Sequence, residues 1–231
     1  MSILTCSALS KRYGANTALD SIDLAIEPGR IVGLLGPNGS GKTTLIKLAN
    51  GLLTPTSGEI RIGGKEPSPQ TKAEVSYLPD RNHLPDWMSV REAIGYYADF
   101  YEDFRKDSAD RMVADLGLNP MQKIKTLSKG TLEKLQLILV MARRAKLYLL
   151  DEPIGGVDPA TRDYILRTII SNYNEEAAVI ISTHLIADVE QVLDEVVFLR
   201  NGRIELHETV DTIRDEKGTS VDALFREVFK C

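Results

Sequence analysis

Cysteine is almost absent from this sequence, which has only Cys6 and Cys231, near its two ends. No CxxC spacing is present, so we expect neither a disulfide framework nor a zinc site, and a reducing cytoplasm suits such a chain. Cys231 is the last residue rather than the fourth from the end, so the C-terminal prenylation signal is absent as well.

Long apolar runs and a basic leader are also missing. Hydrophobic residues make up 43% of the chain, but no run approaches the ~20 residues that a membrane-spanning helix needs. The residues before Lys11 do not form a secretory signal, and a net charge of −5 gives no general attraction to nucleic acid or anionic lipid. We therefore expect a cytoplasmic globular chain, residues 1–231 as one domain, with no nucleic acid partner.

What the sequence does contain is a glycine-rich segment directly after a short apolar run. Residues 31–35 predict a buried strand, and residues 36–43, Gly-Pro-Asn-Gly-Ser-Gly-Lys-Thr, have the spacing of a P-loop. In such a loop, backbone N–H groups and the following helix face a phosphate, Lys42 reaches the β- and γ-phosphates, and the Thr43 hydroxyl ligates Mg²⁺. The candidate nucleotide ligands are Gly36, Asn38, Gly39, Ser40, Gly41, Lys42, Thr43 and Thr44. The segment predicts a nucleoside triphosphate site.

Alternating apolar and polar residues predict strands at both ends of the chain. Residues 22–27 alternate before a Pro-Gly turn, and residues 59–62 alternate before Gly63-Gly64, which suits a hairpin turn. Apolar strands at 147–150 and 178–181 alternate with helices predicted at 132–145 and 159–171. This alternation is typical of a parallel sheet covered by helices. Residues 195–206 predict an edge hairpin around Asn201-Gly202, and an apolar stripe near the end predicts a last helix, on Val221, Leu224, Phe225 and Val228.

A helical unit interrupts these strands. Apolar residues recur every three or four positions and mark one helix face, at Val90, Ile94, Tyr97, Tyr101 and Phe104. Ser89 and Glu92 form a capping box for this helix, and a second helix at 109–116 ends before Gly117. We predict a core of residues 1–85 and 145–231, with residues 86–144 as an inserted helical subdomain.

Two carboxylates, Asp151 and Glu152, follow the predicted strand at 147–150. Ligands bind at the carboxyl ends of strands in open parallel sheets, so Asp151 can hold Mg²⁺ while Glu152 acts on water. Acidic residues also start ordinary loops after strands. The P-loop is what makes the catalytic interpretation the stronger one.

These segments together resemble the nucleotide-binding subunit of ABC transporters, over nearly the whole chain. The resemblance implies an α/β fold of the P-loop NTPase (RecA-like) class, with a parallel-sheet core, an N-terminal antiparallel β subdomain and the inserted helical subdomain. Tyr13 lies where the family stacks an aromatic ring on adenine, although a lone tyrosine is also typical of a half-buried surface position. Residues 127–131, Leu-Ser-Lys-Gly-Thr, resemble the family signature Leu-Ser-Gly-Gly-Gln.

The resemblance further implies a head-to-tail dimer that holds two ATP molecules between its halves. Ser128 and the Gly130 backbone would close over the γ-phosphate bound by the partner's P-loop, and Asp158 would reach across the dimer. Ser128 and Asp158 also suit plain helix caps, and the two roles are compatible. His184 matches the switch histidine that contacts the γ-phosphate in the family, although a lone loop histidine often has no role.

The sequence departs from the family pattern at three positions. Lys129 replaces a glycine of the signature and Thr131 replaces its glutamine. Asp80 stands where the family has a glutamine that links Mg²⁺ and water to the transporter-facing helices, and a carboxylate still binds Mg²⁺ but lacks an amide donor. The Ser-Lys-Gly version of the signature resembles the branch with ABC-2-type exporters.

The resemblance implies an ATPase that uses ATP and Mg²⁺ to drive transport. Lys42 would neutralise phosphate charge, Glu152 would take a proton from water, and His184 would hold the γ-phosphate. Thr43, Asp80 and Asp151 are the candidate metal ligands. Its partners would be separate membrane-spanning permease subunits, at the inner face of the cell membrane, and a second identical or related ATPase chain.

Two other functions stay open from the sequence. One is a soluble ABC protein that acts on ribosomes or DNA, although neither a second cassette nor a coiled-coil or zinc insertion is visible. The other is a nucleotide-sensing module with weak hydrolysis, which the altered signature and Asp80 favour and Glu152 and His184 oppose. A P-loop GTPase fits less well, because no Asn-Lys-x-Asp motif occurs.

Overall fold

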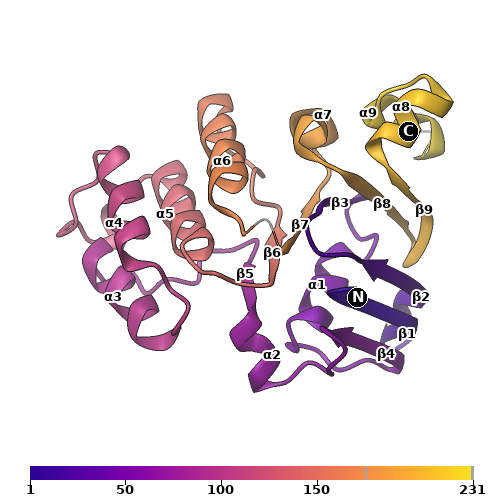
Figure 1. The fold of residues 1–231 in the computed structure, drawn as a ribbon, viewed down its shortest axis with the longest axis horizontal. Coiled ribbons are helices and arrows are strands. Elements are labelled where there is room, and N and C mark those ends of the chain that lie inside the picture. The colour runs from indigo at the N-terminus through magenta and orange to yellow at the C-terminus, as the bar shows by residue number, and fades with distance from the viewer. Residues whose placement is uncertain (175, 230–231) are drawn as a thin grey trace.

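The computed structural model describes residues 1–174 and 176–229, so the prediction about Cys231 lies outside it. Its centre is a six-stranded sheet in which five neighbouring strands run parallel and the sixth closes one edge in antiparallel pairing (Figure 1). In order across the sheet these are β5 (Val75–Leu78), β6 (Leu147–Asp151), β7 (Ala178–Thr183), β3 (Ile31–Leu35), β8 (Glu195–Arg200) and β9 (Arg203–Thr209). The predicted edge hairpin is confirmed, with Asn201 and Gly202 at φ 48° and 77° in its turn.

The inner strands are apolar along nearly their whole length because both faces of the sheet are covered. Alternate residues of β6 enter two different cores: Tyr148 and Leu150 pack on one side, and Leu147 and Leu149 on the other. Helices that come late in the chain cover the first side, namely α5 (Lys129–Met141), α6 (Pro159–Asn172), α7 (Ile186–Val189), α8 (Val210–Lys217) and α9 (Val221–Phe229). α9 carries the predicted C-terminal stripe. The 3-10 helix η2 (Glu190–Val192) extends α7.

The other side of the sheet is covered by α1 (Lys42–Ala49) and by a second sheet. This sheet has three antiparallel strands in the order β2 (Asn16–Ile26), β1 (Leu4–Tyr13) and β4 (Ser57–Ile62), which confirms the predicted antiparallel β subdomain. The hairpin turn predicted at Gly63-Gly64 is confirmed: the two glycines have φ 54° and 78°, and the Ile62 and Lys65 backbones exchange hydrogen bonds of 2.7 and 3.0 Å. The pairing goes no further in the described residues, because Pro67 and Pro69 follow and cannot continue a ladder. The short helix α2 (Pro69–Glu74) begins there instead.

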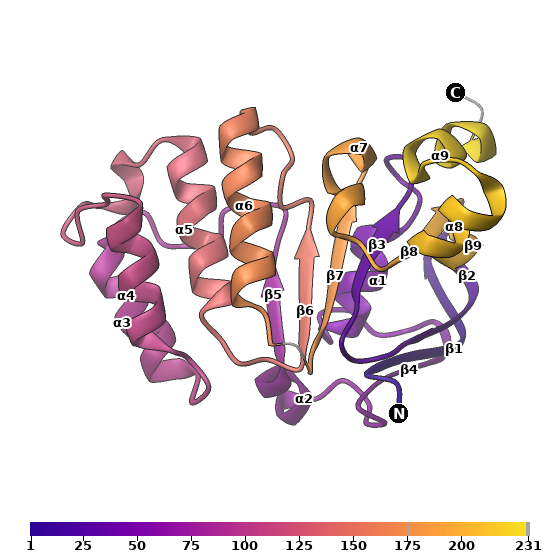
Figure 2. The ribbon, with the colours of Figure 1, turned by 45° about the horizontal axis from the view of Figure 1, so that its top comes forward.

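The helical unit forms its own core at the end of the molecule opposite to the antiparallel sheet (Figures 1 and 2). It contains α3 (Val90–Phe100), α4 (Lys106–Asp115), the 3-10 helix η1 (Ile124–Thr126) and one face of α5. The capping box is confirmed: the Ser89 hydroxyl accepts from the Glu92 N–H at 3.2 Å and Glu92 accepts from the Ser89 N–H at 2.6 Å.

The predicted helix boundaries in this unit need three corrections. α3 ends at Phe100 because Tyr101 is extended, and Phe104 reaches the same core from the next loop. α4 begins at Lys106 and not at 109, although it ends before Gly117 as predicted, with that glycine at φ 64°. α5 spans Lys129–Met141 instead of 132–145, because Ser128 caps its first turn.

Arg143 joins the helical unit to the central sheet. Its guanidinium is 2% exposed and donates to Asp103 at 2.9 Å, and to the Ala73 and Val75 carbonyls beside β5. It also lies 3.8 Å from the centre of the Tyr101 ring. A buried cation with this many partners fixes where the unit sits, because removing one partner leaves an unpaired charge in the interior.

Candidate functional site

The glycine-rich loop leaves β3 and enters α1, as the sequence predicts. Gly39 and Gly41 have φ angles of 80° and 112°, and a Cβ on Gly41 would lie 2.5 Å from the Ala18 carbonyl oxygen. Only glycine fits that position. No side chain caps the N-terminus of α1, so its first backbone N–H groups are available to an anion.

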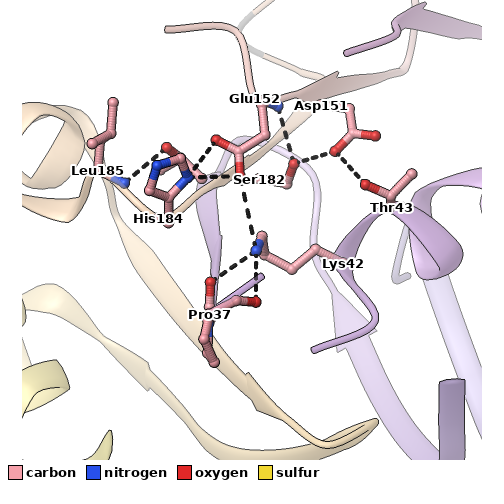
Figure 3. Close-up of polar contacts among 10 residues, drawn as sticks. Pro37, Lys42, Thr43, Asp151, Glu152, Ser182, His184 and Leu185 are labelled. Carbon is pink, nitrogen blue, oxygen red and sulfur yellow. Dashed lines mark hydrogen bonds and ion pairs between the residues drawn. The ribbon is translucent and has the colours of Figure 1, made fainter. Parts of the chain in front are cut away.

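Lys42 lies beneath this loop and is 6% exposed. Its ammonium donates to the Gly36 and Pro37 carbonyl oxygens at 2.8 and 3.2 Å, and lies 3.8 Å from the nearer Glu152 oxygen (Figure 3). Burial lowers the pKa of Lys42, and the charges of Glu152 and Asp151 oppose that shift. The site therefore concentrates one cation between a phosphate-binding loop and two carboxylates.

Thr43 and Asp151 come together from the start of α1 and the end of β6. Asp151 Oδ1 accepts from the Thr43 hydroxyl at 3.1 Å and from the Ser182 hydroxyl at 2.6 Å (Figure 3). Burial raises the pKa of Asp151, while these two hydrogen bonds lower it and the nearby Asp80 and Glu152 charges raise it further. A cation bound beside Asp151 would stabilise its ionised form and so oppose the rise in pKa that burial causes.

These groups fit the Mg²⁺ that the P-loop implies. Asp151 Oδ2 is buried and has no hydrogen-bond partner in the part of the chain that the structure describes. Mg²⁺ takes oxygen ligands and is held by one or two protein groups together with substrate phosphates. The absence of any cluster of three or more His, Cys, Asp or Glu among residues 1–174 and 176–229 is compatible with such a site.

Glu152 and His184 form a pair at the ends of β6 and β7. His184 Nδ1 lies 3.1 Å from both Glu152 carboxylate oxygens (Figure 3). An ionised carboxylate only accepts, so Nδ1 donates in this contact in the tautomer that carries its proton there. Glu152 has φ 51°, which costs of the order of 1 kcal/mol, and its N–H is held by the Ser182 carbonyl at 3.0 Å. Such strain at a strand end aims the carboxylate into the site.

A cleft of about 610 Å³ connects these groups with Tyr13 and Asp80. It is lined by Tyr13, Asn16, Thr17, Ala18, Asn38, Gly39, Ser40, Gly41, Lys42, Thr43, Thr44, Asp80, Glu152 and Asn201. The structure thus brings the predicted aromatic residue, most of the P-loop, Asp80 and Glu152 to one cleft, of the volume that ligand sites usually have, and Asp151 contacts it through Thr43. Tyr13 is 47% exposed, and the Lys11 ammonium lies over its ring, 5.4 Å from the ring centre.

Sequence reasoning missed several residues of this cleft. Asn16 to Ala18 line it from the start of β2, Asn201 lines it from the turn between β8 and β9, and none of them carries a motif. Ser182 belongs to no predicted site, although its side chain donates to Asp151 at 2.6 Å and its carbonyl accepts from the Glu152 N–H at 3.0 Å. A serine in an otherwise apolar strand next to the predicted acidic pair is the one signal that identifies it.

Ser128, Gly130 and Asp158 lie elsewhere, at the starts of α5 and α6. The Ser128 hydroxyl accepts from the Thr131 N–H at 3.2 Å, and Asp158 accepts from the Thr161 N–H at 3.0 Å. Both are helix caps. None of the three is among the described residues that line the cleft.

The starts of α5 and α6 lie next to each other. A Cβ on Gly130 would lie 3.4 Å from the Thr161 hydroxyl and 3.8 Å from Asp158, and the Lys129 ammonium donates to the Gly156 carbonyl at 3.3 Å. Lys129 also lies 3.8 Å from Glu133, one turn later on α5. The signature segment and the loop before α6 therefore form one continuous surface.

Among the described residues, no helix has both the length and the apolar character needed to traverse a bilayer.

Comparison with known proteins places these features in one family. The family described as ABC transporter matches residues 19–155, which include the P-loop and both carboxylates. The ABC transporter ATP-binding protein YtrB of Bacillus subtilis is 31% identical over 211 residues, covering 90% of this chain and 72% of the relative. The SkfA peptide export ATP-binding protein SkfE of the same organism is 30% identical, covering 88% of each. The aliphatic sulfonates import ATP-binding protein SsuB of Escherichia coli is 32% identical, covering 94% and 85%.

Solved structures agree with the sequence relatives. One described as the ATP binding subunit of an ABC transporter superposes with a TM-score of 0.88 at 28% identity, covering 98% of this chain and 99% of the other. This similarity over nearly the full length of both chains confirms the α/β P-loop NTPase fold predicted from the sequence.

Proposed function

The chain belongs to the ABC transporter family of ATP-binding proteins, and we propose that it hydrolyses ATP in a head-to-tail dimer to power a membrane transporter. The observation that carries this proposal is a set of contacts beside one cleft: Glu152 meets both Lys42 and His184, and Thr43 meets Asp151. Phosphoryl transfer to water needs charge neutralisation and an aligned nucleophile, and this set offers both.

Each residue has a proposed role. Lys42 and the loop amides neutralise the phosphates, while Thr43 and Asp151 would hold Mg²⁺, which supplies further charge neutralisation when bound. Glu152 takes a proton from the attacking water, and His184 holds the Glu152 carboxylate in position through the contacts of Nδ1 with both of its oxygens. Asp80 is proposed as an additional oxygen ligand or water contact, because it lines the same cleft as Thr43. The Tyr13 ring stacks on the adenine base of the nucleotide.

The dimer gives Ser128, Gly130 and Asp158 their proposed role. They lie outside this chain's own cleft, on the surface where α5 and α6 begin, and a helix N-terminus with a short hydroxyl cap suits an anion. We propose that this surface closes over the triphosphate bound by a second copy or a related chain. ATP then stabilises the closed state, and hydrolysis removes those contacts.

A groove beside the helical unit is the proposed docking site for a permease subunit. Its volume is about 530 Å³, and Leu52 and Phe100, which are 52% and 66% exposed, lie in its lining together with Tyr77 and Pro79. The occupant we propose is an apolar segment at the inner end of a membrane-spanning subunit, because exposed apolar side chains in a concave surface fit that chemistry. This places the chain in the cytoplasm, at the inner face of the membrane.

Two finer assignments belong to the same proposal. Residues 86–144 act as the subdomain that meets both the permease and the partner's nucleotide, while residues 1–85 and 145–231 bind the chain's own nucleotide. We propose export as the direction on the Ser-Lys-Gly signature alone, since one of the relatives is named for export and another for import.

Purification from native membranes tests the proposal. Affinity capture of the tagged chain in mild detergent is expected to recover a polytopic membrane protein in stoichiometric amount. The matched control is a Phe100→Asp variant, which places a charge in the groove and is expected to lose that partner while keeping ATP binding. Recovery of ribosomes or DNA-bound complexes in place of a membrane protein would support the rival function.

A further inference from the structure

The backbone at Tyr13 is fixed by a hairpin, whereas its ring is not. Tyr13 is the last residue of β1, and it pairs with Asn16 across a two-residue turn in which Gly14 has φ 58°. This pairing holds the backbone at the edge of the nucleotide cleft, but the side chain is 47% exposed. The orientation of the ring therefore depends on its side-chain contacts.

Lys11 supplies such a contact. Its ammonium lies 5.4 Å from the centre of the Tyr13 ring and donates to the Thr54 carbonyl oxygen at 2.7 Å. A cation at this distance over an aromatic face is attracted by the electrons of the ring. The same ammonium thus joins the ring to the backbone of a segment 43 residues later in the chain.

The segment that contains Thr54 is held against β1 by two further hydrogen bonds. The Thr56 N–H donates to the Ser10 carbonyl at 2.9 Å, and the Thr56 hydroxyl accepts from the Arg12 N–H at 3.0 Å. These bonds attach the segment to β1 on both sides of Lys11. The Thr54 carbonyl is therefore a fixed anchor for the ammonium, and the anchored ammonium is a fixed contact for the ring.

The position of Lys11 leaves one side of the ring to a ligand. Tyr13 lines the nucleotide cleft together with Asn16 and the P-loop, whereas Lys11 is not among the described residues of that lining. The ammonium covers the ring from outside the cleft, so a base in the cleft meets the other side. A ring that is already held loses less freedom when a ligand binds, and the affinity rises by the entropic cost that is avoided.

We propose that Lys11 is a positioning residue for nucleotide binding, whose ammonium, anchored on the Thr54 carbonyl, holds the Tyr13 ring in the orientation in which it stacks on the base. The inference rests on the proposed ATP-binding function. It adds to that function a residue that touches neither the base nor the phosphates. The contribution of Tyr13 to affinity then depends on Lys11, and this dependence can be measured.

The test is isothermal titration of the whole chain and of Lys11→Met with Mg²⁺ and ATP. Methionine keeps an unbranched side chain and removes both the charge and the donor. We expect Kd for ATP to rise about two- to fivefold, since one aromatic side chain then has to be ordered on binding. Kd for inorganic triphosphate with Mg²⁺ should stay the same, because this probe has no base. Lys11→Arg keeps a cation over the ring and should bind ATP about as tightly as the wild-type chain.

Arg12→Met is the matched control. It removes the neighbouring positive charge from the same strand while the ring keeps its ammonium, so it should change neither Kd. If Lys11→Met lost equal affinity for ATP and for triphosphate, the charge would act on the phosphates directly and the proposal would be overturned. Tighter binding of ATP by Lys11→Met would also overturn it, because the ammonium would then compete with the base for the ring.

A double-mutant cycle shows whether the effect passes through the ring. In a Tyr13→Ala background, Lys11→Met should cause no further loss of ATP affinity, since no ring remains to be held. Additive losses would overturn the proposal. Equal ATP affinity of the wild-type chain and Lys11→Met would do the same and leave the proposed ATPase function intact, whereas a wild-type chain that does not bind ATP would overturn both.

Discussion

Two helices of this chain begin at motifs that we propose bind phosphate, and they begin in different ways. α1 starts after Gly41, which has φ 112°, and no side chain caps its first turn. α5 starts after Ser128 in the extended region, and the Ser128 hydroxyl occupies the Thr131 N–H at 3.2 Å. The N-terminus of α1 faces a built cleft with a buried lysine, whereas that of α5 is capped by its own chain on an exposed surface.

The difference suits the proposed dimer, in which one chain supplies the α1 part of the site and its partner the α5 part. At α1, every neighbour needed for a nucleotide is present, and uncapped N–H groups persist because the loop geometry leaves no side chain able to reach them. At α5, the cap contributes about 1 kcal/mol, a small enough energy for a charged ligand to replace. We infer that α1 binds nucleotide in the isolated chain, while α5 gains its ligand only when another chain brings one.

The largest expected effect comes from removing the proposed general base, Glu152. Glu152→Gln should lower kcat by about 10²- to 10⁴-fold, because a carboxamide at this position cannot accept the proton of water. ATP affinity should stay nearly unchanged, as measured by titration of a fluorescent analogue. The exposed Glu205→Gln is the control and should hydrolyse ATP at the normal rate. Normal turnover by Glu152→Gln would reject the assigned base.

Removing the Lys42 ammonium should weaken the binding of ATP and not only its hydrolysis. Lys42→Ala loses the ammonium that lies between the loop carbonyls and Glu152, and ATP affinity should fall about 10- to 100-fold, since a charge-assisted hydrogen bond contributes roughly 1.5–3 kcal/mol. Isothermal titration with Mg²⁺ and ATP measures this directly. Lys47→Ala, later on α1, should bind normally, and equal affinity for both variants would contradict the role of Lys42.

The α5 side is tested by Ser128→Ala in the Glu152→Gln background. The variant should bind ATP as tightly as its parent but form less ATP-dependent dimer, seen by light scattering at increasing ATP concentration. Ser89→Ala is a matched control, because Ser89 caps α3 with the same 3.2 Å bond and its loss should cost similar stability without affecting dimerisation. Equal dimerisation by both variants would show that the Ser128 hydroxyl has no role in closure.

The same contrast explains how much could be predicted from the sequence. The P-loop, Asp151 and Glu152 sit at strand ends with strong local patterns, and the structure brings them together as expected. The apolar pattern predicts the start of α5 three residues too late, because Gly130 in the first turn is a poor helix former and the pattern begins only after it. Ser182 could not be assigned, since its role depends on its contacts with Asp151 and Glu152 after folding. That information lies in contacts between distant segments and not in local periodicity.

The smallest expected effect concerns Lys129, the first residue of α5, whose surroundings differ from those of Lys42, the first residue of α1. Lys42 is buried, whereas the Lys129 side chain is 70% exposed and its contacts with Gly156 and Glu133 are long, at 3.3 and 3.8 Å. Such contacts contribute ~0–1 kcal/mol, so Lys129→Met should leave the melting temperature nearly unchanged.

If α5 meets a partner's triphosphate, the positive charge of Lys129 should still favour closure of the dimer at long range. ATP-dependent dimerisation of the variant, again in the Glu152→Gln background, should then weaken a few-fold at low salt and much less near 0.5 M salt, where screening removes the attraction of exposed charges. Lys125→Met, in η1, should change neither value. A deficit that is equal at both salt concentrations would mean that Lys129 acts through its contact with the Gly156 carbonyl and not through its charge.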